Sequence, residues 1–209
     1  MIAREGWPFI LIPLCAGALA VAVGWSFVAI PPVAFAIFSA FFFRNPGRSC
    51  TADALTVCSP ADGRVIKAGP APEGARIDGL PVQVSVFMSV FNVHVNRAPI
   101  AGTLEHYTYN PGRTFAAYKD KASLLNEQNL SVWRGPTGTV ALKQIAGLIA
   151  RRIVFDHRPG DSIRRGERIG LIRFGSRVDV FLPDDAELLV RHGDRVKAGV
   201  SPLARLASP

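Results

Sequence analysis

The chain begins with a long apolar stretch and continues with short apolar runs broken by polar residues. No charged side chain occurs from Trp7 to Phe43. Because a spanning helix needs about 20 apolar residues, this stretch is too long for one helix, while Pro8–Gly24 and Trp25–Phe43 are each barely long enough. We therefore predict a membrane anchor over residues 1–48, with a helical hairpin at about residues 7–43.

Basic residues flank the apolar stretch on both sides. Arg4 precedes it, and Arg44 and Arg48 follow it. Since positive flanks favour the cytoplasmic face, we predict that the rest of the chain lies on the cytoplasmic side of the cell membrane. A re-entrant hairpin that does not fully cross remains open. A cleaved signal sequence is disfavoured, because its apolar core would be shorter.

Beyond residue 48 the apolar residues form short runs separated by Gly, Pro and Asp. Such runs are typical of a sandwich or barrel rather than a helical or doubly wound fold. We predict a mainly β domain over residues 49–209 with a few short helices, and Gln144–Arg152 is the best candidate for a helical exception. The predicted strands are Arg64–Ala68, Val82–Phe87, Gly138–Leu142, Arg168–Phe174, Val178–Leu182 and Glu187–Val190.

Two segments of the β-rich part repeat the pattern Gly-Asp-x-apolar-basic-x-Gly. They are Gly160–Gly166 and Gly193–Gly199, and an apolar run follows each. The pattern predicts strand, turn and strand, with glycine supplying the turn conformation. It is similar to the paired halves of lipoyl-like and biotinyl-like β-sandwiches, although two ordinary hairpins would produce it as well.

Composition narrows the choice of partner. The formal net charge of +8 points to an anionic partner. The apolar stretch favours an acidic membrane surface over nucleic acid, for which no binding motif is present. The three cysteines, Cys15, Cys50 and Cys58, form no Cys-x-x-Cys pair. We therefore predict no disulfide framework, no metal site and a reducing environment.

The segment Phe174-Gly175-Ser176-Arg177 resembles the self-cleavage site of the phosphatidylserine decarboxylase family, in the variant typical of its short, membrane-bound form (type A). Four further blocks resemble the family in the correct order. They are Ser59–Gly63, Phe87–Pro99, Tyr109–Asn129 with its Ala117–Ser123 core, and Gln144–Ile153.

The resemblance implies a proenzyme that cuts itself between Gly175 and Ser176 into a β chain, 1–175, and an α chain, 176–209, which remain together as a heterodimer and could form a higher oligomer. It implies that Ser176 becomes a covalent pyruvoyl group, the cofactor. The cofactor then forms a Schiff base with phosphatidylserine in an anionic membrane, and carbon dioxide is released to give phosphatidylethanolamine.

The residue types suit this chemistry. Decarboxylation of an amino acid needs an electron sink, which pyridoxal phosphate usually supplies, but no phosphate-cradling Gly-rich loop is evident. A pyruvoyl ketone can be made from serine, and Gly175 leaves room for the hydroxyl of Ser176 to reach the preceding carbonyl.

A serine hydroxyl needs a base, and the base needs an orienting carboxylate. By position in the family blocks the resemblance implies His94 for the base and Asp62 for the carboxylate. From pattern alone, His94 would be an ordinary strand histidine and Asp62 a turn residue. Other branches of the family have two histidines in this element, so here His94 could serve both cleavage and decarboxylation. His106, His157 and His192 are predicted to be structural or surface residues.

Alternative functions remain open. One is a pyruvoyl decarboxylase of another serine lipid such as archaetidylserine, and another is a non-enzymatic membrane adaptor with a lipoyl-like domain. A serine hydrolase is weaker, because no Gly-x-Ser-x-Gly elbow is present. Basic residues that could contact lipid phosphate, none of them singled out, are Lys119, Lys121, Arg151, Arg152, Arg164, Arg165 and Arg177.

Overall fold

The computed structural model describes residues 1–112, 126–147, 152–173 and 175–207. The chain divides into two compact units, Met1–Gly47 and Arg48–Pro209, and each is described by itself.

The N-terminal unit is a pair of apolar helices. A short 3-10 turn, η1 (Arg4–Gly6), leads into α1 (Trp7–Ala22), and α2 (Ile30–Phe42) follows. Pro31 and Pro32 lie in the first turn of α2, where a missing N–H is tolerated. The predicted N-terminal helices are thus observed. The segment Arg4–Ala22 is apolar and long enough to span a membrane, whereas α2, with 13 residues, is shorter.

The C-terminal unit is built from strands and one short 3-10 helix, η2 (Glu73–Ala75). Its strands are β1 (Thr56–Cys58), β2 (Gly63–Pro70), β3 (Val82–Met88), β4 (Val95–Arg97), β5 (Gly102–Asn110), β6 (Gln128–Gly135), β7 (Gly138–Ala146), β8 (Ile153–Phe155), β9 (Ser162–Ile163), β10 (Arg168–Ile172), β11 (Ser176–Leu182), β12 (Glu187–Leu188), β13 (Arg195–Val196) and β14 (Pro202–Arg205).

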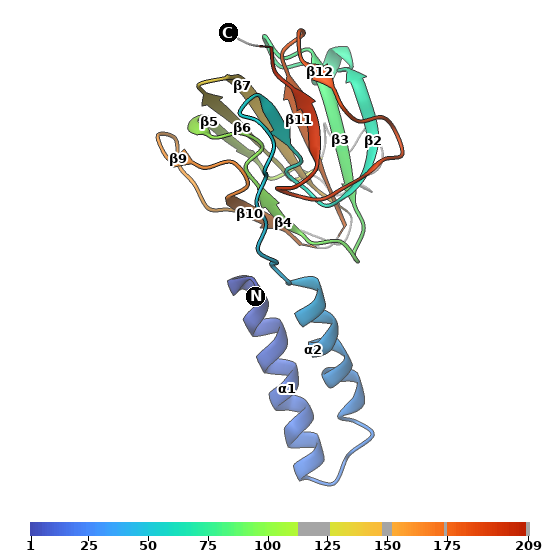
Figure 1. The fold of residues 1–209 in the computed structure, drawn as a ribbon. Helices are drawn as coiled ribbons and strands as arrows, with labels where there is room; N and C mark the ends of the chain where they lie inside the picture. Colours follow the sequence, from blue (N-terminus) through green and yellow to red (C-terminus); the bar gives the residue numbers. More distant parts are fainter. Residues whose placement is uncertain (113–125, 148–151, 174, 208–209) are drawn as a thin grey trace. The chain divides into compact units, whose positions relative to one another are not determined.

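These strands form three open sheets (Figure 1). The largest has the order β13-β2-β3-β11-β7-β6-β5-β9, and the smaller ones are β1-β14-β12 and β4-β10-β8. The mainly β prediction is confirmed, and the sheets are not closed into a barrel. Each predicted strand overlaps an observed one.

Strand β11 lies in the middle of the largest sheet, between β3 and β7. Successive side chains of a strand point to opposite faces. Val178, Val180 and Leu182 therefore join the main hydrophobic core, while Phe181 packs in a separate cluster with Ala141 on the other face. Each strand that flanks β11 contributes apolar residues to the main core, so β11 is buried along its whole length.

The two copies of the Gly-Asp pattern adopt matching structures. Both opening glycines, Gly160 and Gly193, have φ of +97°. Asp161 accepts a hydrogen bond from the backbone N–H of Arg158 at 2.8 Å, and Asp194 accepts one from Arg191 at 2.9 Å. Each copy then enters a two-residue strand, β9 or β13, at opposite edges of the largest sheet. The repeated pattern therefore marks a repeated supersecondary unit.

Two expectations were wrong. Gln144–Ala146 belongs to β7 rather than to a helix, because its side chains alternate between the two faces of the sheet, and residues 148–151 lie outside the described part. Cys50 and Cys58 form a disulfide, with their Cα atoms 6.7 Å apart, since the chain before β1 turns back beside the end of that strand. The cysteine pattern therefore gives no support to a reducing compartment. Cys15 is a free thiol.

Candidate functional site

Ser176 is the first residue of β11 and is completely buried. It lies in register with Met88 of β3 and Ala146 of β7, and its Oγ donates a hydrogen bond to Met88 Sδ at 3.3 Å. Gly175 has φ of +61°, a conformation that costs a residue with a Cβ about 1–2 kcal/mol. A Cβ there would meet no atom within 4 Å, so backbone conformation rather than space favours glycine.

His94 is brought to the segment that precedes Ser176 by pairing between β4 and β10. The backbone N–H of Ile172, at the end of β10, donates to the carbonyl of His94 at 3.3 Å. The His94 side chain is buried, and its Nδ1 lies 3.0 Å from the Asn92 carbonyl. Because a carbonyl only accepts, Nδ1 is the donor, and in the neutral ring Nε2 then holds the lone pair. This tautomer suits a base that acts through Nε2.

Asp62 has partners other than His94 in this structure. Its carboxylate forms a two-point ion pair with the Arg48 guanidinium, in which Nη2 lies 2.9 Å from Oδ2. The backbone N–H of Ala198 also donates to Oδ1 at 2.7 Å. The structure thus joins the His94 segment to the segment before Ser176, and it shows Asp62 paired with Arg48. Phe174 lies outside the described residues.

A chain of buried polar side chains continues from Ser176 into the interior. Asn96 Nδ2 lies 3.7 Å from Met88 Sδ, the atom that Ser176 contacts. Gln144 donates to Asn96 Oδ1 at 2.6 Å, and Asn129 donates to Gln144 Oε1 at 2.9 Å. Buried amides are costly unless they are hydrogen-bonded, so these contacts hold the three side chains in one arrangement. We call this set the amide ladder.

Sequence reasoning assigned no role to the amide ladder, and it used Arg48 only as a positive flank of the apolar stretch. The sequence signal for the amide ladder was a polar residue at an inward-facing position of an otherwise apolar strand. Gln144 is such a residue, because it lies between Leu142 and Ala146, and all three are buried. The partner of Gln144 could not be read from sequence, because Asn96 comes from a strand 48 positions earlier.

The opposite face of β11 holds a second polar cluster. Arg177 is 3% exposed, and its Nε and Nη2 donate to the two carboxylate oxygens of Asp179 at 2.6 and 2.9 Å. Burial lowers the pKa of Lys143, while the nearby Asp179 carboxylate opposes that shift. Arg177 is therefore enclosed and paired, and the suggestion that it contacts lipid phosphate is wrong. Lys119, Lys121 and Arg151 lie outside the described residues.

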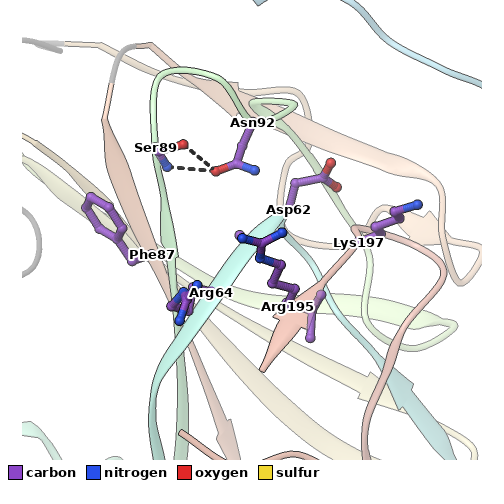
Figure 2. A pocket seen from close by; sticks show the side chains of 9 residues that line it. Asp62, Arg64, Phe87, Ser89, Asn92, Arg195 and Lys197 are labelled. Carbon is purple, nitrogen blue, oxygen red and sulfur yellow. Dashed lines mark hydrogen bonds between the residues drawn. The ribbon is translucent and has the colours of Figure 1, made fainter. Parts of the chain in front are cut away.

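A cavity of about 530 Å³ opens beside Asp62 (Figure 2). Ser89 and Asn92 line one side, where the backbone N–H and the hydroxyl of Ser89 both donate to Asn92 Oδ1 at 2.9 and 2.8 Å. Arg64, Arg195 and Lys197 line the cavity as well, and all three are exposed. We call this cavity the Asp62 pocket. Its lining has three cations against one carboxylate, which suits an anionic ligand.

The candidate functional groups of this unit are a buried serine hydroxyl, a buried histidine ring and a cavity lined by cations. Ser176 offers a hydroxyl after a left-handed glycine, and His94 offers a ring nitrogen with a lone pair. Among the residues that the structure describes, no group of three or more His, Cys, Asp or Glu side chains could hold a metal ion.

Comparisons with known proteins agree on one family. Residues 35–204 match the family model described as phosphatidylserine decarboxylase. The chain is 45% identical to the phosphatidylserine decarboxylase proenzyme of Magnetococcus marinus, over 99% of this chain and 95% of that protein. It is 49% identical to the proenzyme of the same name from Solibacter usitatus, over 93% of this chain and 92% of that protein. It is 47% identical to the proenzyme of that name from Azorhizobium caulinodans, over 97% of this chain and 88% of that protein.

The ion pair between Arg48 and Asp62 should contribute to stability, because its side chains are only 12% and 10% exposed. A double-mutant cycle with Arg48→Met and Asp62→Asn, followed by urea unfolding of the full chain in detergent, should give a coupling free energy of about 1–3 kcal/mol. The matched cycle on Arg134 and Glu105, whose side chains are 64% and 40% exposed, should give a much smaller coupling. Equal coupling free energies in the two cycles would contradict a buried, energetically coupled pair of Arg48 and Asp62.

Proposed function

Because the chain belongs to the phosphatidylserine decarboxylase family, a family of carboxy-lyases, we propose that it is a proenzyme that converts phosphatidylserine to phosphatidylethanolamine and carbon dioxide. The observation that supports this most directly is the Gly175–Ser176 bond, where a glycine of positive φ precedes a buried serine hydroxyl at the head of β11. A structural strand serine would require neither the left-handed glycine nor the neighbouring histidine segment.

In the proposed cleavage, Ser176 Oγ attacks the carbonyl carbon of Gly175. His94 takes the hydroxyl proton and returns it to the Ser176 nitrogen as the peptide C–N bond breaks, which leaves an ester. Removal of the Ser176 Cα proton then expels the Gly175 carboxylate by β-elimination. Addition of water to the resulting enamine and loss of ammonia leave a ketone, the pyruvoyl group, at the new N-terminus.

The proposed carboxylate role of Asp62 is compatible with the contacts that it makes. Oδ1 accepts hydrogen bonds from Arg48 and from the Ala198 backbone, whereas Oδ2 accepts one from Arg48. A carboxylate oxygen has two lone pairs. Oδ2 therefore retains capacity for a second donor. In this structure the Nδ1–H of His94 donates to the Asn92 carbonyl, so His94 would donate to Asp62 only after its ring turns away from that carbonyl.

The residues around Ser176 fit a group made from its own side chain. Ser176 is enclosed by strands on both sides, so the ketone formed there would be held away from bulk water. A pyruvoyl group supplies the electron sink that decarboxylation needs. His94 would hold the proton that the substrate carbon receives after carbon dioxide leaves, and the amide ladder would hold Met88 against the position of Ser176.

The two proposed pieces, 1–175 and 176–209, would remain together without a covalent link. Strand β11 of the smaller piece pairs with β3 and β7 of the larger piece along its full length. Strand β14 pairs with β1, and Ala198 is held by Asp62 and Arg48. The smaller piece therefore supplies a central strand, and its loss would open the main core.

The Asp62 pocket is the proposed site of the substrate head group. A serine phospholipid carries a phosphate and a carboxylate, and Arg64, Arg195 and Lys197 provide cations for both. The same cations would accept archaetidylserine, whose head group is identical, so that lipid remains the second candidate. The apolar α1 would keep the enzyme at the membrane, and we propose the cytoplasmic face of the cell membrane for its catalytic unit.

Loss of His94 should block self-cleavage. We expect His94→Ala to slow the appearance of the smaller piece at least about 100-fold, because proton transfer by a positioned base contributes roughly that much. His106→Ala is the matched control, since His106 is exposed and its Nε2 lies 2.6 Å from the hydroxyl of Thr108. Denaturing gels of freshly synthesised chain, with carbon dioxide release from phosphatidylserine vesicles, provide the measurement.

The Ser176→Ala variant, which lacks the hydroxyl, gives the background level for both measurements, the appearance of the smaller piece and the release of carbon dioxide. Cleavage and decarboxylation by His94→Ala at the rate of His106→Ala would exclude His94 as the base. Carbon dioxide release by Ser176→Ala at the wild-type rate would remove the proposed function altogether.

Neutralising the Asp62 pocket should weaken substrate binding without preventing cleavage. We expect Arg195→Gln with Lys197→Gln to raise KM for phosphatidylserine about threefold to tenfold, a modest effect because both side chains are exposed. Arg191→Gln is the control, since that side chain is 92% exposed and lies outside the pocket lining. An unchanged KM in the double variant would place the head group elsewhere.

A further inference from the structure

A second cavity of about 420 Å³ is lined by an unusual number of arginines. They come from the segment after the apolar helices, from β4, from the turn between β9 and β10, and from the first residue of β10. Glu167 is the one acidic residue in the described lining. We call the cavity the arginine pocket, and its arginines are Arg48, Arg97, Arg164, Arg165 and Arg168.

The arginine pocket has more positive charge than its neighbouring carboxylates cancel. Three of the five arginines pair with a carboxylate each, through the ion pairs Arg48–Asp62, Arg168–Asp156 at 2.8 Å and Arg164–Glu167 at 3.3 Å. Arg97 donates to the Gly166 carbonyl at 2.8 Å among its contacts, and Arg165 donates to the backbone carbonyls of Ala52, Asp53 and Thr56. A carbonyl accepts a hydrogen bond but does not neutralise a charge, so an excess of cations remains.

The neighbouring positive charges affect the pKa of Arg97, the buried arginine of this pocket. Arg97 is 8% exposed. Burial lowers the pKa of its guanidinium, and the like charges of Arg48 and Arg168 lower that pKa further, whereas the Asp62 carboxylate raises it. An anion placed among these side chains would offset both the repulsion and the loss of solvation.

We propose that the arginine pocket binds the phosphate group of an anionic glycerophospholipid. Guanidinium groups present paired donors that match phosphate oxygens. Arg48 is the sixth residue after Phe42, where the apolar α2 ends, and six residues span at most about 20 Å. A chain held in a membrane by those helices therefore keeps Arg48 within reach of lipid head groups. This inference goes beyond the proposed function, because substrate is assigned to the Asp62 pocket.

The two pockets are separate but connected through one ion pair. They share no lining residue, yet Arg48 of the arginine pocket contacts the carboxylate of Asp62, which lines the other. An anion that draws on Arg48 would therefore alter the charge balance at Asp62. The arginine pocket is thus placed to sense the membrane surface beside the site of the proposed reaction.

Calorimetric titration can test the assignment on the full chain carrying Ser176→Ala, which cannot turn over, so the result does not depend on the proposed function. The probes, in neutral detergent, are dihexanoyl phosphatidylglycerol, dihexanoyl phosphatidylcholine and inorganic phosphate. The pocket variant is Arg164→Glu with Arg168→Gln. The control is Arg158→Glu with Arg191→Gln, which changes the charge equally on exposed residues outside the lining.

We expect phosphatidylglycerol to bind about tenfold more tightly than phosphatidylcholine, with about a tenfold loss in the pocket variant and less than a twofold change in the control. Arg164→Glu alone, at a side chain that is 91% exposed, provides a variant that should fold normally and lose about threefold. Equal binding of the two lipids, or equal losses in pocket and control variants, would overturn the proposal. Inorganic phosphate that binds as tightly as phosphatidylglycerol would overturn the lipid assignment.

Discussion

The placement of β11 between β3 and β7 is the constraint on which the rest of the site depends. Backbone pairing on both sides fixes Ser176 at the head of a fully buried strand. Gly175 directly precedes the strand, and a residue with a Cβ would adopt its positive φ only at a cost. The same pairing would keep the two proposed pieces together, because β11 of the smaller piece is a central strand of a sheet whose neighbouring strands, β3 and β7, belong to the larger piece.

Burial of polar groups is the second organising feature. Asn96, Gln144 and Asn129 are linked by hydrogen bonds in the interior, and Arg177 and Asp179 are paired on the opposite face of the sheet. Each set would be costly if a member were left without a partner. Such networks favour one arrangement of the strands, so Ser176 and the histidine segment are held by surroundings that tolerate little displacement.

Local pattern was sufficient for the six strands named from sequence, the apolar helices and the repeated Gly-Asp units, because periodicity and turn residues determine these over a few positions. It did not single out others, such as β5 and β6. It was insufficient for features that depend on strand register. Neither the Arg48–Asp62 pair nor the disulfide between Cys50 and Cys58 follows from spacing. Arg177 looked like a lipid contact until its pairing with Asp179 was seen. Ser176 and His94 were singled out by the family blocks in which they lie.

The intact mass of the denatured, purified chain tests the central claim most directly. The account predicts two pieces, residues 1–175 and residues 176–209, with the smaller lighter by one ammonia than a peptide that begins with an unmodified serine. A single chain of full length, from protein shown to be folded, would contradict self-cleavage at Gly175–Ser176. Two pieces with an unmodified N-terminal serine would contradict formation of the pyruvoyl group.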